Sequence, residues 1–239
     1  MAKYYIASCV FTAKFPELSF RIQDYIQKRF GFTVVRCCVP KYKLKDFEDK
    51  MPEGQIRSDW ANLPDSGTFS DGDEVYSLCH NCNNLINEMH PGTKVHSLWE
   101  LIDGDDSFRL PDFRGRKAYV QDCWRSRDRK EEQDAVRSLL NKMNIDVLEL
   151  SQNREQTDFC GASLYRPQPP RNPKLAPEAL RRRCRRKIRA PFAGRTETDH
   201  AGILSSIRQR QSHLLLSLLL RRTLDGRRRC GTSGTDVVS

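Results

Sequence analysis

The chain has 239 residues and a formal net charge of +10, with 41 Lys and Arg against 31 Asp and Glu. It has no run of about 18 apolar residues and no apolar stretch of secretory type near its start, so we expect no membrane span and a cytoplasmic location. In that reducing compartment its nine cysteines are better metal ligands or redox thiols than disulfide partners.

The positive charge comes entirely from the C-terminal segment. Residues 1–177 contain 26 Lys and Arg and 26 Asp and Glu, whereas residues 178–239 contain 15 and 5. Charge of this kind can attract nucleic acid. The segment lacks interleaved aromatic residues and any nucleic-acid-binding motif, however, so we expect no nucleic-acid partner. Two unlike sequences are therefore joined near Pro177.

Strand and helix patterns alternate along the first hundred residues. Apolar, β-prone runs and helically spaced apolar residues are separated by Gly and Pro. Residues 40–73 are polar and indicate a long connection. The alternation predicts an α/β fold with small, mainly parallel sheets. The expected strands are 4–8, 32–35, 74–78 and 94–98, and the expected helices are 16–30 and 81–89.

Cysteines follow the ends of three of these strands. Cys9 follows the first, the Cys37-Cys38 doublet the second, and the Cys79-x-x-Cys82 pair the third, where it opens a helix. Ligands collect at the carboxyl edge of parallel sheets, and a helix N-terminus favours thiolates. Four thiolates complete a zinc site, and a fifth indicates a cluster of more than one metal atom. Buried structural thiols are the alternative.

The pattern of the first module restarts after residue 112. Residues 118–123 resemble residues 4–9, and Cys123 stands 114 positions after Cys9. A helical pattern, a β-prone run and Cys160-Gly161 follow, but no second CxxC appears. We therefore expect a first cysteine-rich module at 1–112 and a second, incomplete module at 113–177.

Residues 178–239 are typical of out-of-frame translation. They are rich in Arg, Leu and Ser, the residues with six codons each. With codons assigned for residues 212–224, a one-base shift gives V-I-C-Y-C-H-Y-C, which resembles residues 75–82 and restores the missing CxxC. We hypothesise a one-base frameshift near Pro177 and expect the basic tail to be disordered.

The arrangement of cysteines resembles the cysteine-rich CCG domain, which is repeated in the B subunit of heterodisulfide reductase. The chain departs from that domain at Val39-Pro40, which replaces a glycine, and at the second doublet, where only Cys160 is present. The resemblance implies a non-cubane [4Fe-4S] cluster on the five cysteines of the first module. It also implies a four-thiolate site for zinc or an ordinary cluster in the second, of which Cys123 and Cys160 are present.

The resemblance implies an iron–sulfur electron-transfer protein, an oxidoreductase subunit that reduces a disulfide at its cluster. A flavin or ferredoxin-type subunit would then be its redox partner. A non-enzymatic zinc-binding assembly module and a nonfunctional frameshifted product are the alternatives. We expect His80 to donate to a neighbouring ligand rather than to bind metal, and Cys123-Trp124-Arg125 to bind an anion, tune a cluster or simply pack.

Overall fold

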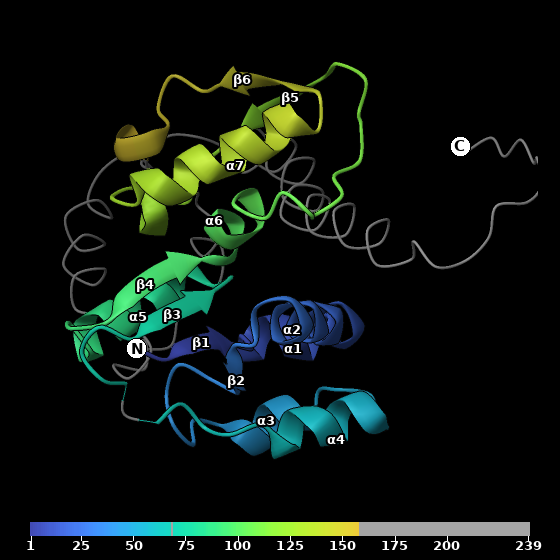
Figure 1. Cartoon of the computed structure of the whole chain (residues 1–239), viewed down its shortest axis with the longest axis vertical. Helices are drawn as coiled ribbons and strands as arrows, with labels where there is room; N and C mark the ends of the chain where they lie inside the picture. Colours follow the sequence, from blue (N-terminus) through green and yellow to red (C-terminus); the bar gives the residue numbers. More distant parts are fainter. Residues whose placement is uncertain (68, 158–239) are drawn as a thin grey trace, which may run out of the picture.

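A computed structural model describes residues 1–67 and 69–157 of the chain. Helices and strands alternate along them (Figure 1). The strands are β1 (Lys3–Ile6), β2 (Thr33–Val35), β3 (Glu74–Ser77), β4 (Lys94–Ser97), β5 (Arg116–Val120) and β6 (Ile145–Glu149). The helices are α1 (Cys9–Lys14), α2 (Pro16–Phe30), α3 (Leu44–Glu48), α4 (Gln55–Asn62), α5 (His80–Met89), α6 (Leu98–Asp103) and α7 (Lys130–Lys142), with short 3-10 turns η1 (Trp124–Ser126) and η2 (Arg154–Gln156).

Four strands form a parallel sheet in the order β2-β1-β3-β4. Tyr5 of β1 is in register with Val34 of β2 on one side and Tyr76 of β3 on the other. The two inner strands are buried over their carboxyl halves, at Tyr5 and Ile6 of β1 and at Val75, Tyr76 and Ser77 of β3. The sheet confirms the expected α/β fold with parallel strands, and it brings the carboxyl ends of β1, β2 and β3 to one edge.

A second, two-stranded parallel sheet is formed by β5 and β6. The turn η1 and the helix α7 connect its strands, as α1 and α2 connect β1 and β2. Figure 1 places this unit at the end of the molecule opposite α3 and α4. The restart of the sequence pattern therefore corresponds to a second strand–helix–strand unit, which packs on the first through contacts between α6 and α7.

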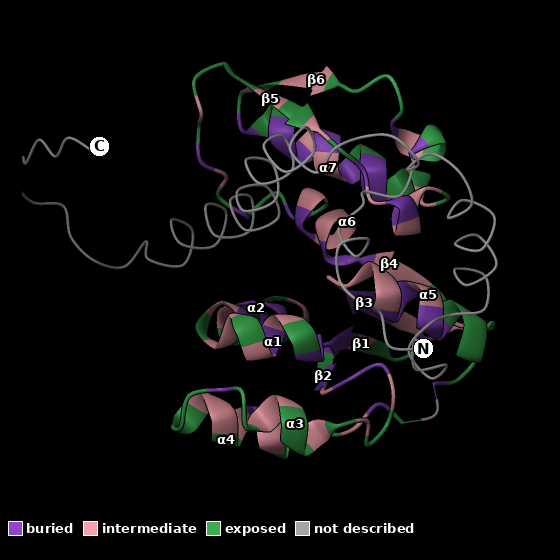
Figure 2. Ribbon diagram, turned by 180° about the vertical axis from the view of Figure 1, so that it is seen from behind, coloured by how far each residue is buried: buried purple, intermediate pink, exposed green. Residues whose placement is uncertain are grey.

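The helix α2 illustrates how the sequence sets an element. Pro16 occupies its first turn, where no backbone donor is lost, and Gly31 ends it in the left-handed conformation at φ 68°. Ile22 and Ile26, one turn apart, are fully buried against the sheet. The apolar core continues from there to Leu139 of α7 and to Met143, which caps that helix, so both units share one core (Figure 2).

The polar stretch 40–73 is more ordered than expected, because it contains the helices α3 and α4. Trp60 of α4 is only 2% exposed and anchors this segment in the common core. Met51 and Phe69 of the same stretch are also buried in that core. The short helices α1 and α6 were also not expected, because six residues give too little periodicity to read.

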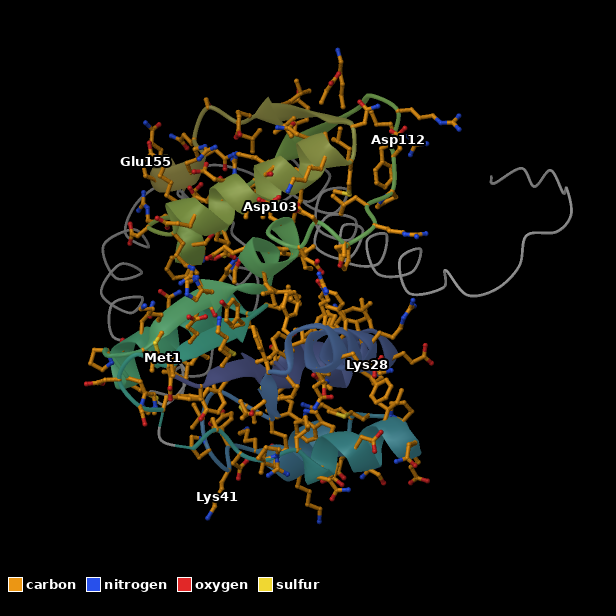
Figure 3. The ribbon with its side chains drawn as sticks, viewed as in Figure 1. Met1, Lys28, Lys41, Asp103, Asp112 and Glu155 are labelled. Carbon is orange, nitrogen blue, oxygen red and sulfur yellow. The ribbon has the colours of Figure 1, made fainter. Side chains whose placement is uncertain are left out.

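Charged side chains lie mainly at the periphery of the molecule. Lys28, Lys41 and Glu155 are exposed and project outward in Figure 3. Within the described residues, no helix is both long and apolar enough to cross a membrane. The predictions made for Cys160 and for the tail at 178–239 fall outside the residues that the structure describes.

Candidate functional site

The five cysteines of the first module lie at the carboxyl edge of the parallel sheet. Cys9 begins α1 after β1, Cys37 and Cys38 follow β2, Cys79 is the N-cap residue of α5 after β3, and Cys82 lies in the first turn of that helix. Because β2, β1 and β3 are adjacent and parallel, these strand ends meet. We call this set the five-cysteine cluster.

The thiols of the five-cysteine cluster interact in a row. The Cys37 side chain hydrogen-bonds the thiols of Cys9 and Cys38. Cys38 in turn interacts with Cys82, and Cys82 with Cys79. Four of the five are buried, Cys79 is half-buried, and none is in a disulfide. The structure therefore places the five cysteines at one sheet edge, where their thiols influence one another.

The pKa values of two of these thiols are lowered by the neighbouring cysteines. Hydrogen bonds from Cys38 and Cys9 lower the pKa of Cys37 well below its usual value. A hydrogen bond from Cys82 lowers the pKa of Cys79 to about 5, against the effect of burial. The pKa of Cys82 moves in the opposite direction, because its hydrogen bonds with Cys38 and Cys79, together with burial, raise it well above its usual value. A lowered pKa favours the thiolate, which is the form that binds metal.

Across the part of the chain that the structure describes, no three His, Cys, Asp or Glu side chains are arranged to hold a metal ion. The fit of a metal group to this edge therefore rests on its donor set, five sulfur ligands of the kind that iron–sulfur clusters and zinc take. One buried polar atom beside the cysteines also lacks a hydrogen-bond partner among the described residues. Asn83 is 1% exposed, and its Nδ2 has no hydrogen-bond partner among the described residues.

The Asn83 side chain is held against the backbone of Cys79. Its Oδ1 accepts from Ser77 Oγ at 2.6 Å, and that same Oγ accepts from the Cys79 backbone N–H at 3.2 Å. The spare amide donor thus belongs to the loop that presents Cys79. A donor in this place suits a sulfur-rich group, since hydrogen bonds to sulfur tune iron–sulfur sites.

Cys123 lies next to α5, apart from the row of five sulfurs. Its thiol hydrogen-bonds the imidazole of His80, and it also accepts from the backbone N–H of Arg125. The second predicted ligand of that module, Cys160, lies outside the described residues. Cys123 therefore has a partner that sequence reasoning did not assign to it.

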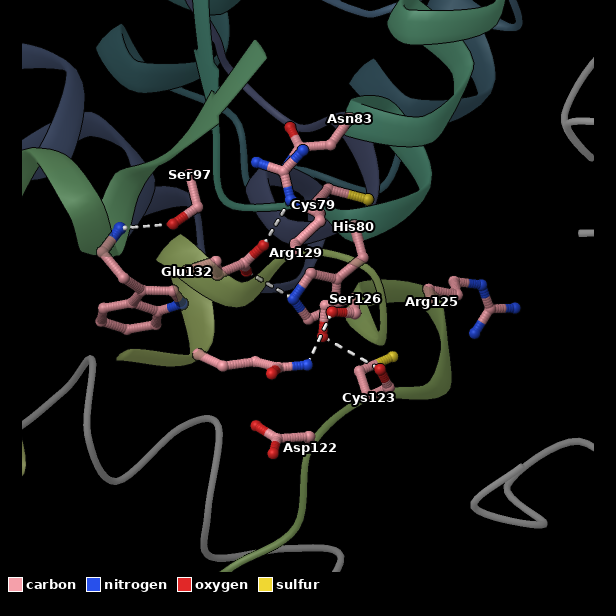
Figure 4. A network of polar contacts seen from close by, with 12 residues as sticks. Cys79, His80, Asn83, Ser97, Asp122, Cys123, Arg125, Ser126, Arg129 and Glu132 are labelled. Carbon is pink, nitrogen blue, oxygen red and sulfur yellow. Dashed lines mark hydrogen bonds and ion pairs between the residues drawn. The ribbon is translucent and has the colours of Figure 1, made fainter. Parts of the chain in front are cut away.

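His80 connects Cys123 to a buried carboxylate. Its Nε2 is 2.7 Å from Oε1 of Glu132, a residue that is 3% exposed. Glu132 Oε2 accepts from Arg129 Nε at 2.7 Å, and Arg129 also donates to the Val95 carbonyl at 3.2 Å. Figure 4 shows His80 directed toward Glu132 and toward the turn that carries Cys123 and Ser126. We call Cys123, His80 and Glu132 the Cys–His–Glu set.

Contacts within the Cys–His–Glu set shift the pKa of each of its three groups toward the charged form. Burial alone would lower the pKa of His80, but its hydrogen bonds to Cys123 and Glu132 raise it well above the usual value. Burial would raise the pKa of Glu132, and the contact with His80 instead holds it below its usual value. His80 likewise lowers the pKa of Cys123 against the effect of burial. An imidazolium between two anions is the form that these contacts favour.

The backbone around Cys123 is fixed from both sides. Asp122 is 8% exposed and accepts from Arg137 at 2.8 and 3.1 Å. The Cys123 carbonyl accepts from the backbone N–H of Ser126 at 2.8 Å, and Asn84 of α5 donates to the Arg125 carbonyl at 3.0 Å. The turn η1 is thereby tied to the start of α5, which places Cys123 beside His80.

Glu132 is the residue of this set that the sequence analysis missed. It stands three positions before Ala135 and seven before Leu139, on the apolar face of α7. A carboxylate among the buried positions of an amphipathic helix is a signal that could have been read.

Comparison of the chain with protein-family models, with curated proteins and with solved structures gives no match.

Proposed function

We propose that this protein is an iron–sulfur electron-transfer protein of the heterodisulfide reductase B type. The five-cysteine cluster would hold a non-cubane [4Fe-4S] group, which carries electrons and, when bound, supplies iron at which a disulfide can be reduced. The observation that supports this most is the row of interacting thiols at one sheet edge, which includes the Cys37-Cys38 doublet. A lone zinc ion needs four ligands, so the fifth favours a larger group.

The chain's own residues would hold and tune that group. The strand ends after β1, β2 and β3 fix the sulfurs, and burial of four of them keeps water out. Asn83 Nδ2 is a free donor beside Cys79 for a sulfur atom of the group. A flavin or ferredoxin-type protein would supply the electrons, and the reducing cytoplasm suits the free thiols.

Metal and sulfide analysis tests the proposal. Full-length protein prepared without oxygen should be brown and contain iron and acid-labile sulfide in about equal amounts. Cys37→Ser and Cys82→Ser should each lower the iron content several-fold. Cys184→Ser removes one cysteine outside the described residues and is the matched control, with iron content unchanged.

A different metal would overturn the proposal in a recognisable way. Colourless protein with one zinc ion per chain, lost in the same Cys37→Ser and Cys82→Ser variants, would identify a zinc-binding assembly module instead. Iron content that does not respond to either substitution would show that the five-cysteine cluster is not the site.

A further inference from the structure

Two segments of the chain lead directly away from the five-cysteine cluster. The helix α1 begins with Cys9, and residues 39–45 follow Cys38 and lead into α3. The Cys37 thiol interacts with both Cys9 and Cys38, and α1 and α3 are in contact. Figure 2 shows exposed parts of both helices on the same side of the molecule. The two segments therefore form one surface beside the buried cysteines.

The outer face of α1 carries an apolar side chain and a cation. Val10, which follows Cys9, is 63% exposed. Lys14 stands four positions later, on the same face of the helix, and is also exposed. An apolar side chain beside charged ones is common in surfaces that bind another protein.

Residues 39–45 add a concentration of positive charge to this surface. They include three lysines and no carboxylate, and Lys41, Lys43 and Lys45 are all exposed. Lys43 is paired with Asp46 at 3.6 Å. Lys41 and Lys45 have no carboxylate partner among the residues that the structure describes. Their charge is therefore available to a second molecule.

The carboxylates nearby do not cancel this charge. Glu48 and Asp49, at the end of α3, are paired with Arg57 at 3.8 and 2.9 Å. Lys14, like the lysines of the neighbouring segment, has no carboxylate partner in the described part of the chain. The result is a local excess of cations on a surface that also exposes one valine. We call this set the lysine face; it consists of Val10, Lys14, Lys41 and Lys45.

The backbone that presents these lysines is unusual. Lys41 and Lys43 have φ of 56° and 43°, in the left-handed region that favours glycine and asparagine. The side chain of Lys41 projects outward from the molecule in Figure 3. Residues held in a disfavoured conformation are concentrated at functional sites, so the turn indicates a role for the lysines that it exposes.

We propose that the lysine face is the docking surface of an acidic electron-carrier protein. The need for such a surface rests on the proposed function, in which a redox protein supplies electrons to the five-cysteine cluster. Four of those cysteines are buried, so the carrier has to dock on the segments beside them. Unpaired lysines attract a partner with clustered carboxylates and speed its association. Electron-transfer complexes have small, weak interfaces, which suits a face with a single exposed valine.

Binding of an acidic plant-type [2Fe–2S] ferredoxin to the full-length protein tests the proposal. A variant that combines Lys14→Glu, Lys41→Glu and Lys45→Glu should bind this ferredoxin about tenfold more weakly at about 0.05 M salt, measured by isothermal titration calorimetry. The difference should shrink at about 0.5 M salt, because salt screens exposed charges. The same three positions changed to Gln should lower the affinity by a smaller factor.

The matched control reverses three exposed lysines elsewhere in the described residues. Lys94→Glu, Lys117→Glu and Lys130→Glu together change the net charge by the same amount. The basic segment 178–239 is identical in both variants, so its charge cannot account for a difference between them. The control should lose much less affinity, because exposed charges beyond a Debye length of the partner are screened.

Iron content, measured in each variant, separates this proposal from the proposed function. If the protein contains iron but both triple variants lose equal affinity, the lysine face is not the docking surface and the proposed function stands. If the protein lacks iron but still binds the ferredoxin through the lysine face, the proposed function fails and the docking surface stands. Tighter binding of a random-sequence DNA of about 20 nucleotides, lost in the lysine-face variant, would overturn the proposal in favour of a nucleic-acid site.

Discussion

At the scale of single residues, the buried guanidinium of Arg137 is the most sensitive point of the second unit. It is 7% exposed and binds the Asp122 and Glu149 carboxylates. Arg137→Met leaves the buried Asp122 without its cation, which should lower the free energy of unfolding by about 3 kcal/mol. Urea denaturation measures this loss.

An exposed ion pair gives the matched control for Arg137. Arg154 and Asp134 are in contact at 2.6 Å with side chains 34% and 48% exposed. Arg154→Ala should change the free energy of unfolding by less than about 1 kcal/mol, because solvent screens such pairs. Adding Asp122→Asn to Arg137→Met should recover part of the stability. Equal losses for the two arginine variants would show that burial of the Arg137 network contributes nothing.

Acid stability depends on Asp105. Burial would raise the pKa of this carboxyl, but Arg29, Ser107 and Tyr25 donate to it and hold its pKa well below the usual value of about 3.9. A carboxyl with a depressed pKa stabilises the fold above its unfolded pKa, and that stability is lost as the pH falls toward the folded pKa. We therefore expect the free energy of unfolding to fall steeply below about pH 4.

Substitution at Asp105 checks this assignment. Asp105→Asn should be less stable than the unsubstituted protein at pH 7, and its stability should fall less steeply between about pH 4 and pH 2, measured by urea denaturation at each pH. Asp106→Asn changes the exposed neighbour and should keep the steep fall. If the free energy of unfolding of Asp105→Asn still falls as steeply at low pH, other carboxyls cause that fall.

At the scale of elements, the end of α2 depends on a glycine. Gly31 has φ 68°, and an added Cβ would meet no atom within 4 Å. Gly31→Ala should therefore lower the free energy of unfolding by about 1 kcal/mol through backbone conformation alone. Gly104 ends α6 at φ −81°, where alanine is allowed, so Gly104→Ala should be neutral or slightly stabilising. Thermal unfolding of both variants compares them, and equal shifts would contradict this account.

The sequence predicts those elements whose signals are local. The helix α2 was predicted at residues 16–30, because Pro16 begins it, Gly31 follows its last residue and the spaced isoleucines lie within it. The helices α3 and α4 could not be predicted, because their order depends on burial of Trp60 against distant parts of the chain. The local polarity of residues 40–73 indicated a loop, whereas tertiary packing orders two helices there.

The same distinction between local signals and tertiary packing applies to the candidate site. The five-cysteine cluster could be predicted because parallel strands bring their carboxyl ends to one edge, so position in sequence gives position in space. The contact of Cys123 with His80 could not, because 43 positions separate them and only the docking of η1 against α5 joins them.

At the scale of the whole molecule, the two units differ in how their first strands are paired. β1 lies between β2 and β3, whereas β5 is paired with β6 alone among the described residues. Tyr119 of β5 is also 59% exposed, which is unusual for a large aromatic side chain. If the second unit repeats the first, a further parallel strand belongs beside β5, on the side away from β6.

A shifted frame would supply that strand. The one-base shift of residues 212–224 gives V-I-C-Y-C-H-Y-C, the counterpart of β3 and the start of α5. We therefore predict that a gene with one base restored near the codon for Pro177 yields a more soluble protein. Its free energy of unfolding should be higher, because an added strand would pair with the β5 edge.

Resequencing and urea denaturation together decide this prediction. The matched control is a chain with the same restored frame but with the new CxxC changed to Ser-x-x-Ser. If strand pairing causes the gain in stability, this control chain should keep the gain. If a second metal site causes the gain, the control chain should lose it. A natural gene that reads in the present frame, with no gain on restoration, would mean that β5 is the true edge of the sheet and that the second unit is complete with two strands.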